Sequence, residues 1–242
     1  RARLSGRRRR LRRDRLRLRP PPLEGPCSWL VIPANRSRLS PVNFQDTQLI
    51  GVLARAESTV SSLSSLLGGL VEKFAARGYS LYLVGGSVRD ALLGRLGNDL
   101  DFTTPARPEV VKEILDEWAE TVWDTGIDFG TVSAAYKGQQ IEITTFRSDS
   151  YDGQSRNPEV VYGDTLEGDL VRRDFKANAM AIELLADASF KFHDPLHGLH
   201  DIADRVLDTP DKPEISFHDD PLRMLRAARF ASQLEFRVAD RV

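Results

Sequence analysis

The sequence predicts an α/β (α+β) fold, in which helices flank a mixed, partly antiparallel sheet and the start of an all-helical segment follows. Two observations carry this prediction. Helical and strand patterns alternate between residues 58 and 123, and a strand hairpin comes directly after them. Hydrophobic residues make up 41% of the 242 residues, which is enough to bury a core of the size that such a fold requires.

The helices are predicted from spacing and from their end signals. Apolar residues recur every three or four positions in residues 58–77, and Gly78 follows as a C-terminal stop. A second helical pattern covers residues 108–118 and has a proline near its start. A third covers residues 166–174. We expect the first of these to be an amphipathic helix packed on the domain.

The strands are predicted from short runs of β-branched and aromatic residues. They are expected at residues 81–84, 99–102, 120–123, 131–136 and 139–146, with Lys137 and Gly138 as the turn between the last two. Residues 181–185 and 189–193 form a further candidate hairpin. Residues 149–163 are rich in Asp, Ser, Gly and Asn and are predicted to be a surface loop and a candidate mobile flap.

The strongest functional signal is the strand, turn and helix of residues 81–93. Gly85 and Gly86 form the turn, and the free N–H groups of the helix that begins near Ser87 point back at it. This geometry can hold a phosphate. An ordinary turn is the alternative interpretation, and the carboxylates that follow favour phosphate binding over it.

Asp99 and Asp101 are separated by one apolar residue, Leu100, so a strand places both carboxylates on the same face. Two such oxygen ligands suit Mg²⁺, which completes its coordination shell with waters and substrate phosphates. Glu142 leaves a second strand opposite two isoleucines and would complete a three-carboxylate site. In that site it would orient or deprotonate an attacking hydroxyl group in phosphoryl transfer.

Arginines near the C-terminal half are candidate ligands for a nucleotide. Arg173 is a plausible phosphate or ribose clamp, with Asp174 orienting it and Asn178 bonding locally. Asp219 or Asp220 is expected to cap a helix that has Pro221 in its first turn.

On this helix Arg223, Arg226 and Arg229 are predicted to share one ridge. The residues predicted to face inward are Leu222, Leu225 and Phe230. Asp220 and Arg223 together present an acceptor and a donor that fit the base edges of C and A better than those of G and U. A solvated helix face is the alternative interpretation of the ridge.

His193, His197 and His200 lie within eight residues and suggest a zinc site, which would predict a phosphohydrolase-like activity. The stronger interpretation is a turn, because no cysteine lies nearby and zinc needs at least three convergent ligands.

The charge of the chain is divided. Residues 1–40 carry 13 arginines and 2 acidic residues, a charge of +11, which leaves −12 of the total −1 for residues 41–242. The basic segment is predicted to be a disordered leader, with an RNA-binding or membrane-surface arm and a targeting peptide as alternatives. Cys27 is the only cysteine, which is typical of the cytoplasm. No run of about 18 apolar residues could span a bilayer.

Four motifs together carry a resemblance. They are residues 83–90 with 99–101, residues 141–147, residues 172–179 and residues 219–226. In this order and spacing they resemble the class II tRNA nucleotidyltransferase and bacterial poly(A) polymerase family, within the polymerase-β-like nucleotidyltransferase superfamily. The resemblance covers about residues 60–238.

The resemblance implies a nucleotidyltransferase that extends an RNA 3′ end with CTP and ATP, uses Mg²⁺ and releases pyrophosphate. It implies that Asp99 and Asp101 hold the metal ions and that Glu142 is the third carboxylate. The residues that it implies for nucleotide contact are Gly85, Gly86, Arg89, Arg173, Asp220, Arg223, Arg226 and Arg229. The implied partners are tRNA, CTP and ATP, with no membrane. Poly(A) addition and a nucleotide-binding or RNA-binding remnant without turnover are the alternatives.

The predicted organisation has three parts. Residues 1–42 are the leader, residues 43–195 the catalytic head, and residues 196–242 the start of a helical neck. Members of the resembled family continue through further helices that grip tRNA, so this chain is expected to be a fragment that binds nucleotide but holds tRNA poorly. Lys176 departs from the family, which usually has Thr there.

Overall fold

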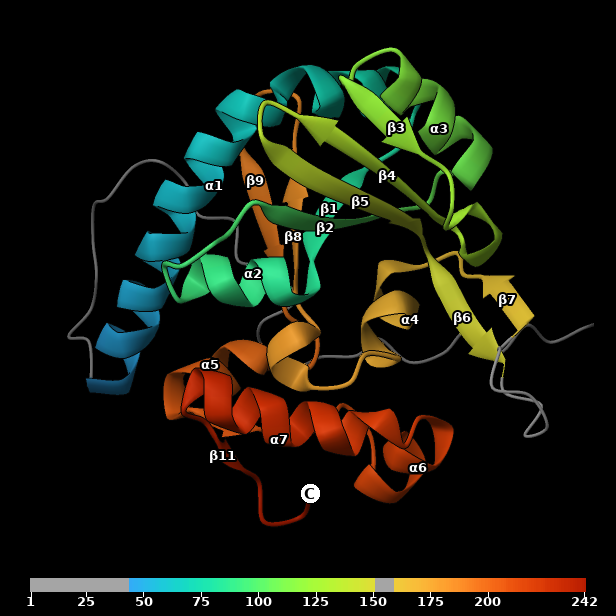
Figure 1. Cartoon of the computed structure of the whole chain (residues 1–242). Coiled ribbons are helices and arrows are strands. Elements are labelled where there is room, and N and C mark those ends of the chain that lie inside the picture. Colours follow the sequence, from blue (N-terminus) through green and yellow to red (C-terminus); the bar gives the residue numbers. More distant parts are fainter. Residues whose placement is uncertain (1–43, 151–158) are drawn as a thin grey trace, which may run out of the picture.

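The structure is a computed structural model that describes residues 44–150 and 159–242. Its centre is a seven-stranded sheet in the order β3-β4-β5-β2-β1-β8-β9 (Figure 1). Within this sheet β2 and β5 are parallel and the other neighbours are antiparallel. The strands are β1 (Leu81–Val84), β2 (Asp99–Thr104), β3 (Thr121–Trp123), β4 (Thr131–Tyr136), β5 (Gln139–Thr145), β8 (Ala181–Leu184) and β9 (Phe190–His193). The predicted mixed sheet flanked by helices is confirmed.

The parallel pair decides where the chemistry can lie. Leu100 pairs with Ile141 and Phe102 with Ile143, and all four side chains are buried beneath the sheet. Because side chains alternate along a strand, the residues between them must face the other way. Asp101 and Glu142 therefore lie directly opposite each other on the open face.

Helix α1 (Phe44–Ala76) is longer than predicted. It was expected to begin near residue 58, but the buried stripe extends back through Val60, Ala56 and Val52 at spacings of four, so the helix keeps its contact with the core. Its end is as predicted. Gly78 follows with a φ of +78°, which a glycine adopts without strain.

The remaining helices cover the sheet or lie beneath it. They are α2 (Gly85–Leu92), α3 (Pro108–Asp116), α4 (Leu166–Val171), α5 (Gly198–Asp204), α6 (Pro213–Asp219) and α7 (Leu222–Leu234), with the short 3-10 turns η1 (Ile127–Phe129) and η2 (Lys176–Asn178). Figure 1 places α7 on the far side of α2 and α4 from the sheet. Among the described residues, no helix is both long and apolar enough to cross a membrane.

Residues 149–163 do not form a simple surface loop. Their ends belong to an antiparallel pair, β6 (Arg147–Ser150) and β7 (Glu159–Tyr162). The sequence of β7 ends in two valines and a tyrosine, which favour a strand, and the polar composition of its surroundings obscured this. Residues 151–158 of the predicted flap lie outside the described residues, as does the predicted leader at residues 1–42.

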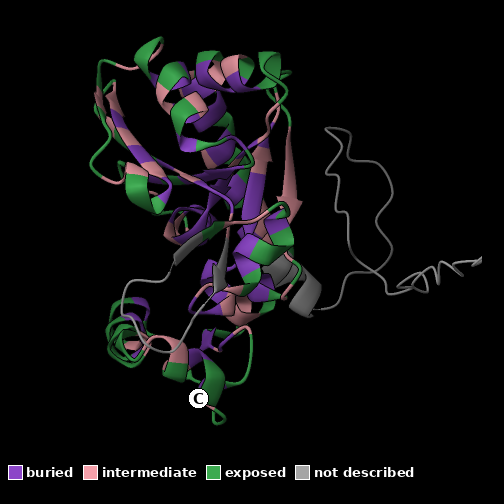
Figure 2. Ribbon diagram, turned by 90° about the vertical axis from the view of Figure 1, so that its right-hand side faces the viewer, coloured by how far each residue is buried: buried purple, intermediate pink, exposed green. Residues whose placement is uncertain are grey.

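The C-terminal part is mainly helical, but it also holds a short parallel pair, β10 (Val206–Leu207) with β11 (Arg237–Val238), that the sequence did not predict. One hydrophobic core continues from α1 through the sheet to Phe230 and Leu234 of α7. Figure 2 shows the buried residues gathered between the sheet and its helices. The division at residue 195 stays a prediction.

The orientation predicted for α7 is wrong for two of its three apolar residues. Phe230 is buried, whereas Leu222 is 63% exposed and Leu225 70% exposed. The buried stripe is instead Ala227, Phe230 and Leu234, at spacings of three and four. The helix is therefore rotated about its axis relative to the prediction, so that these two leucines face outward.

Candidate active site

The glycines at the start of α2 allow a close approach of side chains. Gly85 begins the helix with a φ of +68°, and a Cβ placed there would lie 3.0 Å from Nη1 of Arg173 and 3.7 Å from Oδ2 of Asp101. A Cβ on Gly86 would lie 3.3 Å from Nη2 of Arg89. Glycine is therefore what lets the Arg173 guanidinium reach the N-terminus of α2. No side chain caps this terminus, so its N–H groups remain for a ligand.

Ser87 connects this helix to the carboxylate strand. Its hydroxyl donates to the carbonyl oxygen of Asp99 at 3.3 Å and accepts from the backbone N–H of Asp101 at 3.0 Å. The hydroxyl is buried together with the rest of its side chain. It thereby fixes the distance between the glycine turn and the two aspartates.

The carboxylates behave as a group of like charges. Solvent reaches Asp101 through the cavity, but the surrounding protein withdraws water from it and raises its pKa, and repulsion from Glu142 and Asp99 raises it further. Arg173 acts in the opposite direction. Such a cluster favours a bound cation, which would relieve the repulsion.

The structure brings this donor set together only in part. In residues 44–150 and 159–242, no group of three or more Asp, Glu, His or Cys side chains lies close enough to hold a metal ion as it stands. Asp101 and Glu142 face the cavity, whereas Asp99 is exposed at the start of β2 and is not among the lining residues. The residue types fit a hard divalent cation, which takes one or two carboxylates and fills its shell with water and phosphate oxygens.

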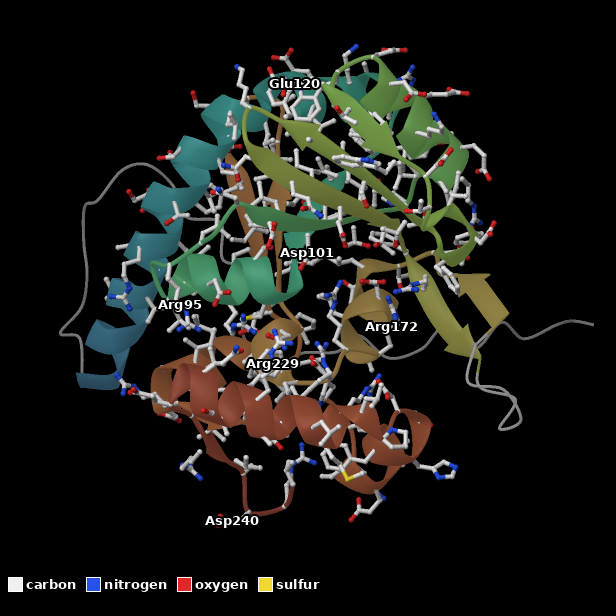
Figure 3. All side chains as sticks on the ribbon, in the orientation of Figure 1. Arg95, Asp101, Glu120, Arg172, Arg229 and Asp240 are labelled. Atoms are coloured by element: carbon white, nitrogen blue, oxygen red, sulfur yellow. The ribbon has the colours of Figure 1, made fainter. Side chains whose placement is uncertain are left out.

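A cavity of about 540 Å³ contains all the other predicted site residues. It lies between the open face of the sheet, α2, α4 and α7, and Figure 3 shows Asp101, Arg172 and Arg229 facing this region from three different elements. The charged residues that line it are Arg89, Asp101, Glu142, Arg147, Arg172, Arg173, Asp174, Asp220, Arg223, Arg226 and Arg229. Arginines outnumber the acids, so the cavity suits a polyanion next to a carboxylate pair.

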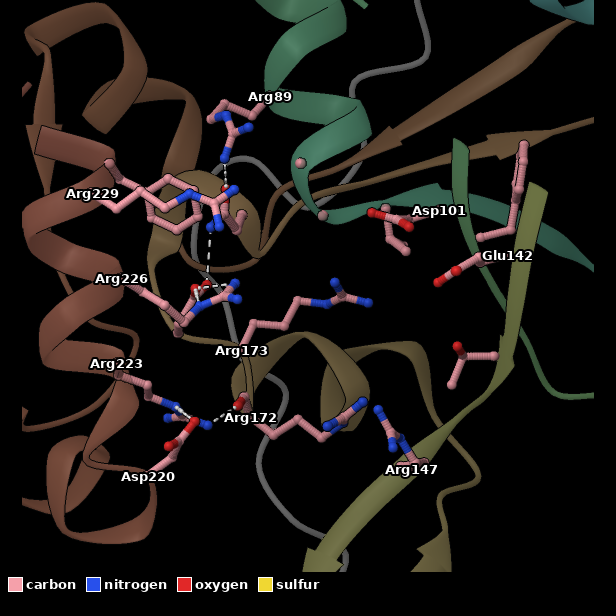
Figure 4. Close-up of a pocket in the computed structure, with 18 residues that line it drawn as sticks. Arg89, Asp101, Glu142, Arg147, Arg172, Arg173, Asp220, Arg223, Arg226 and Arg229 are labelled. Carbon is pink, nitrogen blue, oxygen red and sulfur yellow. Dashed lines mark hydrogen bonds and ion pairs between the residues drawn. The ribbon is translucent and has the colours of Figure 1, made fainter. Parts of the chain in front are cut away.

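Arg173 extends from the end of α4 toward the carboxylates (Figure 4). Its partner is Asp169, whose Oδ2 accepts from Nη2 at 2.9 Å. The prediction that Asp174 orients Arg173 is therefore wrong, because Asp169 lies one helical turn earlier and Asp174 lies beyond the end of α4. The Nε of Arg173 is buried and has no hydrogen-bond partner among the described residues.

Asp174 belongs to a separate chain of hydrogen bonds. Its Oδ2 accepts from Arg226 at 2.7–2.8 Å, and its Oδ1 accepts from the amide of Asn178 at 2.9 Å. The Asn178 oxygen accepts from Nη1 of Arg89 at 2.7 Å. This chain joins α2 to α7 through η2, so Asn178 bridges two helices as well as bonding locally. Arg89 is also held by Asp90, at 2.8 Å.

The pair predicted to select the base lies at the α7 end of the cavity. Nη1 of Arg223 donates to Ser216 at 2.9 Å and Nη2 donates to the carbonyl oxygen of Arg172 at 2.8 Å, while Nε lies 4.0 Å from Asp220. Asp220 does act near the helix start, since its Oδ1 accepts from the N–H of Leu222. The other arginine of the ridge, Arg229, donates to Gln233 at 3.2 Å.

Sequence reasoning gave no role to Arg147, Arg172 and Asp169. Arg147 and Arg172 enter the sequence analysis only as members of two motifs, yet both line the cavity. Asp169 lies four residues before Arg173, and this spacing in a helix is the one signal that could have linked the two. Lys176 does not line the cavity and pairs with Asp208 at 2.7 Å.

The histidines do not converge. The Nε2 of His193 lies 3.3 Å from Oε2 of Glu183 on the neighbouring strand, and the rings of His197 and His200 stack edge to face at 5.9 Å between centroids. His197 is in the left-handed region, with a φ of 61°, in the turn that opens α5. This agrees with the turn interpretation.

Comparison with known proteins identifies the family to which the part of the chain around this site belongs. Residues 81–208, more than half of the chain, match the family described as the poly A polymerase head domain. The chain belongs to this family. The match contains both halves of the phosphate and carboxylate arrangement as well as α4 and η2.

The relatives of this chain include proteins named CCA-adding enzyme and tRNA nucleotidyltransferase. The CCA-adding enzyme of Listeria innocua is 43% identical over 170 residues, which cover 70% of this chain and 41% of that enzyme. The crystal structure of the Bacillus stearothermophilus CCA-adding enzyme in complex with CTP superposes with a TM-score of 0.62. Its sequence is 37% identical, over 74% of this chain and 41% of that one.

A tRNA nucleotidyltransferase complexed with a primer tRNA and an incoming ATP analog superposes with a TM-score of 0.60 at 33% identity, over 71% of this chain and 46% of that chain. The head-domain chain thus spans about two fifths of the length of the curated relatives that it matches.

Proposed function

We propose that this chain is the catalytic head of a tRNA nucleotidyltransferase that adds C and A to tRNA 3′ ends from CTP and ATP. One observation carries the proposal. A single cavity joins a carboxylate pair, the uncapped start of α2 with its two glycines, an excess of arginines and the Asp220–Arg223 pair. The relatives named above as bound to CTP, an ATP analog and tRNA support the same choice of substrates.

In the proposed reaction, the 3′ hydroxyl of the RNA attacks the α-phosphorus of the nucleotide, and the bond to the pyrophosphate oxygen breaks. Glu142 would accept the proton of the attacking hydroxyl, and Asp99 and Asp101 are the residues that would hold Mg²⁺. When bound, Mg²⁺ supplies charge neutralisation at the phosphate oxygens. The raised pKa of Asp101 supports this assignment, because burial is the largest cause of the rise and the repulsion from Glu142 and Asp99 that adds to it would be offset by a bound cation.

The triphosphate would lie between the start of α2 and the arginines that enter from the opposite side. Gly85 and Gly86 offer backbone N–H groups, and Arg173 offers its guanidinium from within van der Waals reach of Gly85. Arg89 would contribute mainly its positive charge near the triphosphate, because its guanidinium nitrogens already donate hydrogen bonds to Asp90 and Asn178. Arg226 and Arg229 would support the nucleotide from α7.

The base would meet Asp220 and Arg223. Ser216 and the Arg172 carbonyl hold two nitrogens of the Arg223 guanidinium, its Nε lies 4.0 Å from Oδ2 of Asp220, and both residues line the cavity. A carboxylate oxygen beside a guanidinium offers one acceptor and one donor. This pair matches the amino group and ring nitrogen of C or A.

The deciding experiment measures incorporation of labelled CTP and ATP, with Mg²⁺, onto tRNA that ends before its CCA. Ordered addition of C, C and A by the wild-type chain, lost in Asp99→Ala and Asp101→Ala, is the expected result. Addition of A alone to any RNA end would favour poly(A) polymerase, which the family description also names. Binding of CTP and ATP without any addition would contradict the proposed activity and favour a nucleotide-binding remnant.

A further inference from the structure

Asp169 is the buried carboxylate to which the arginines at the end of α4 are attached. It is completely buried in the middle of α4. Its Oδ2 accepts from Nη2 of Arg173 at 2.9 Å, and its Oδ1 accepts from Nε and Nη2 of Arg172, both at 3.2 Å. The same Oδ1 accepts from the backbone N–H of Arg147 at 3.3 Å, where β6 begins. One side chain thus contacts three arginine residues that line the cavity.

The charge balance at Asp169 shows that these contacts hold an ionised carboxylate. Burial by itself would raise the pKa of Asp169, but the Arg173 and Arg172 guanidinium groups more than offset it and hold the pKa below its ordinary value. The two arginine side chains keep about one fifth of their surface exposed, on the cavity side. Each guanidinium group is therefore held by Asp169 in a side chain that lines the cavity.

Long arginine side chains lose much rotational freedom when they bind a ligand, and this loss weakens binding. An arginine that is already fixed by a buried carboxylate loses less. The arrangement also has a direction, because Asp169 holds both arginines while the Arg173 side chain extends toward the carboxylates (Figure 4).

We propose that Asp169 is a positioning residue for the triphosphate, acting through Arg173 and Arg172 without touching the ligand. The inference rests on the proposed function, since it supplies the triphosphate. It assigns to Asp169 a role in affinity for the phosphates and none in the choice of base, which lies with Asp220 and Arg223 at the other end of the cavity.

The substitution Asp169→Asn tests this proposal, because a purely electrostatic role and a positioning role of Asp169 predict opposite changes in the affinity for CTP. It removes a negative charge from beneath a site for a polyanion, so electrostatics alone predicts tighter binding of CTP. Positioning predicts weaker binding, because the amide cannot hold both guanidinium groups. We expect the dissociation constants for CTP and for inorganic tripolyphosphate, measured by calorimetry, to rise by the same factor, about tenfold, the loss typical of a charged hydrogen bond. The preference for CTP over UTP should stay unchanged.

Asp187→Asn is the matched control, because it makes the same charge change at an exposed aspartate whose partner is Ser189, in the turn between β8 and β9. It should bind CTP like the wild type. In a chain that carries Arg172→Ala and Arg173→Ala, Asp169→Asn should weaken CTP binding less than twofold further, since the groups it acts through are gone. Thermal melting checks the folding of each variant.

Asp169→Glu keeps the charge and displaces the carboxylate, so it provides a second test should Asp169→Asn fail to fold. Unchanged or tighter binding in either folded variant overturns the proposal, as does a loss confined to CTP and absent for tripolyphosphate. A wild-type chain that binds CTP but never extends RNA contradicts the proposed function, while weaker CTP binding by Asp169→Asn still supports the positioning role. A wild-type chain that binds neither CTP nor tripolyphosphate overturns both.

Discussion

Asp101 is the residue whose chemistry depends most on its neighbours. Its pKa is raised by the surrounding protein and by repulsion from Glu142, so it takes up a proton at a higher pH than an ordinary aspartate. A protonated Asp101 is a poor metal ligand. We therefore expect nucleotide incorporation to fall as the pH decreases through this raised pKa, and excess Mg²⁺ to shift the fall to lower pH.

Asp101→Asn should lower the rate of nucleotide incorporation by at least about 100-fold, the loss typical of an electrostatic group at a reaction centre. It should leave thermal stability nearly unchanged, because the carboxylate faces the cavity. Asp116→Asn, an exposed aspartate paired with Lys112 on α3, serves as control and should be fully active. Equal rates in the two variants would remove Asp101 from the reaction.

Asp201 on α5 is expected to make the stability of the fold depend on pH. Burial raises its pKa to about 6, Lys176 partly offsets this and Asp208, Asp194 and Asp204 add to it. Its Oδ2 is buried without a hydrogen-bond partner in the described part of the chain. The folded state then holds a proton more tightly than the unfolded state, whose aspartate titrates near 3.8. The free energy of unfolding must therefore fall as the pH rises through this window.

Asp201→Asn removes this cost. At pH 8 we expect the variant to be more stable than the wild type by about 1 kcal/mol, because the side chain is only half buried, or roughly 2–4 °C in melting temperature. At pH 4 the two proteins should melt together, since the wild-type carboxyl is then protonated. A variant that is less stable than the wild type at pH 8 would show that the ionised carboxylate has a favourable partner.

At the scale of elements, the junction between η2 and α5 depends on Gly198. A Cβ there would collide with the carbonyl oxygen of Lys176 and lie 2.8 Å from its carbonyl carbon and 3.1 Å from Cγ of Met180. Backbone atoms cannot move aside cheaply. We expect Gly198→Ala to cost roughly 2 kcal/mol, measured by urea unfolding. Gly97→Ala, where a Cβ meets nothing within 4 Å, should cost little, and equal losses would contradict the packing argument.

Gly68 makes the opposite prediction in the long helix α1. It lies in the helix interior, and a Cβ placed there meets nothing within 4 Å. Alanine restricts the unfolded chain and favours the helix, so Gly68→Ala should stabilise the protein by about 0.5–1 kcal/mol in the same urea experiment. A destabilised variant would mean that α1 is not helical at this position.

The sequence predicts some features of the structure correctly and others wrongly, and β2 and α7 show why. The spacing of Asp99 and Asp101 predicts a shared face because a strand alternates with a period of two whatever surrounds it. The rotation predicted for α7 was wrong because Arg223 lies one turn before the buried Ala227, on the same side of the helix, where Ser216 on α6 and the Arg172 carbonyl satisfy its charge. One partner lies seven residues earlier on a separate helix, and the other lies 51 residues earlier.

Asp169 illustrates the same limit for the site. A carboxylate in a polar helical segment reads as solvent-facing, and here it is completely buried because β6 and two arginines converge on it. The contacts that decide burial are tertiary, and one sequence does not contain them. What the sequence did predict, a helix after β1 and the carboxylate strand, depends on bonds within a few residues, although α2 begins at Gly85 and the two glycines form its first turn instead of a turn before it.

At the scale of the whole molecule, Phe230 joins the two sides of the cavity. Its ring packs edge to face on Phe175 at 5.9 Å between centroids and lies under the guanidinium groups of Arg89 at 5.1 Å and Arg226 at 5.3 Å. These residues come from α2, from the approach to η2 and from α7. Because the ring is buried in the common core, α7 should unfold together with the sheet in a single transition.

Phe230→Ala should therefore weaken both the fold and the selection of the base. We expect a loss of about 3–5 kcal/mol in the free energy of unfolding, typical of a buried aromatic residue, measured by urea denaturation. We also expect weaker discrimination between CTP and UTP, because Arg223 lies in the first turn of the same helix and Asp220 lies just before that turn. Leu225→Ala, on the exposed side of α7, should change stability by less than about 0.5 kcal/mol. Equal losses of stability in the two variants, or full discrimination in Phe230→Ala, would show that this ring does not hold α7 on the head. The Asp174–Arg226 pair would then be the contact that positions the base-selecting residues.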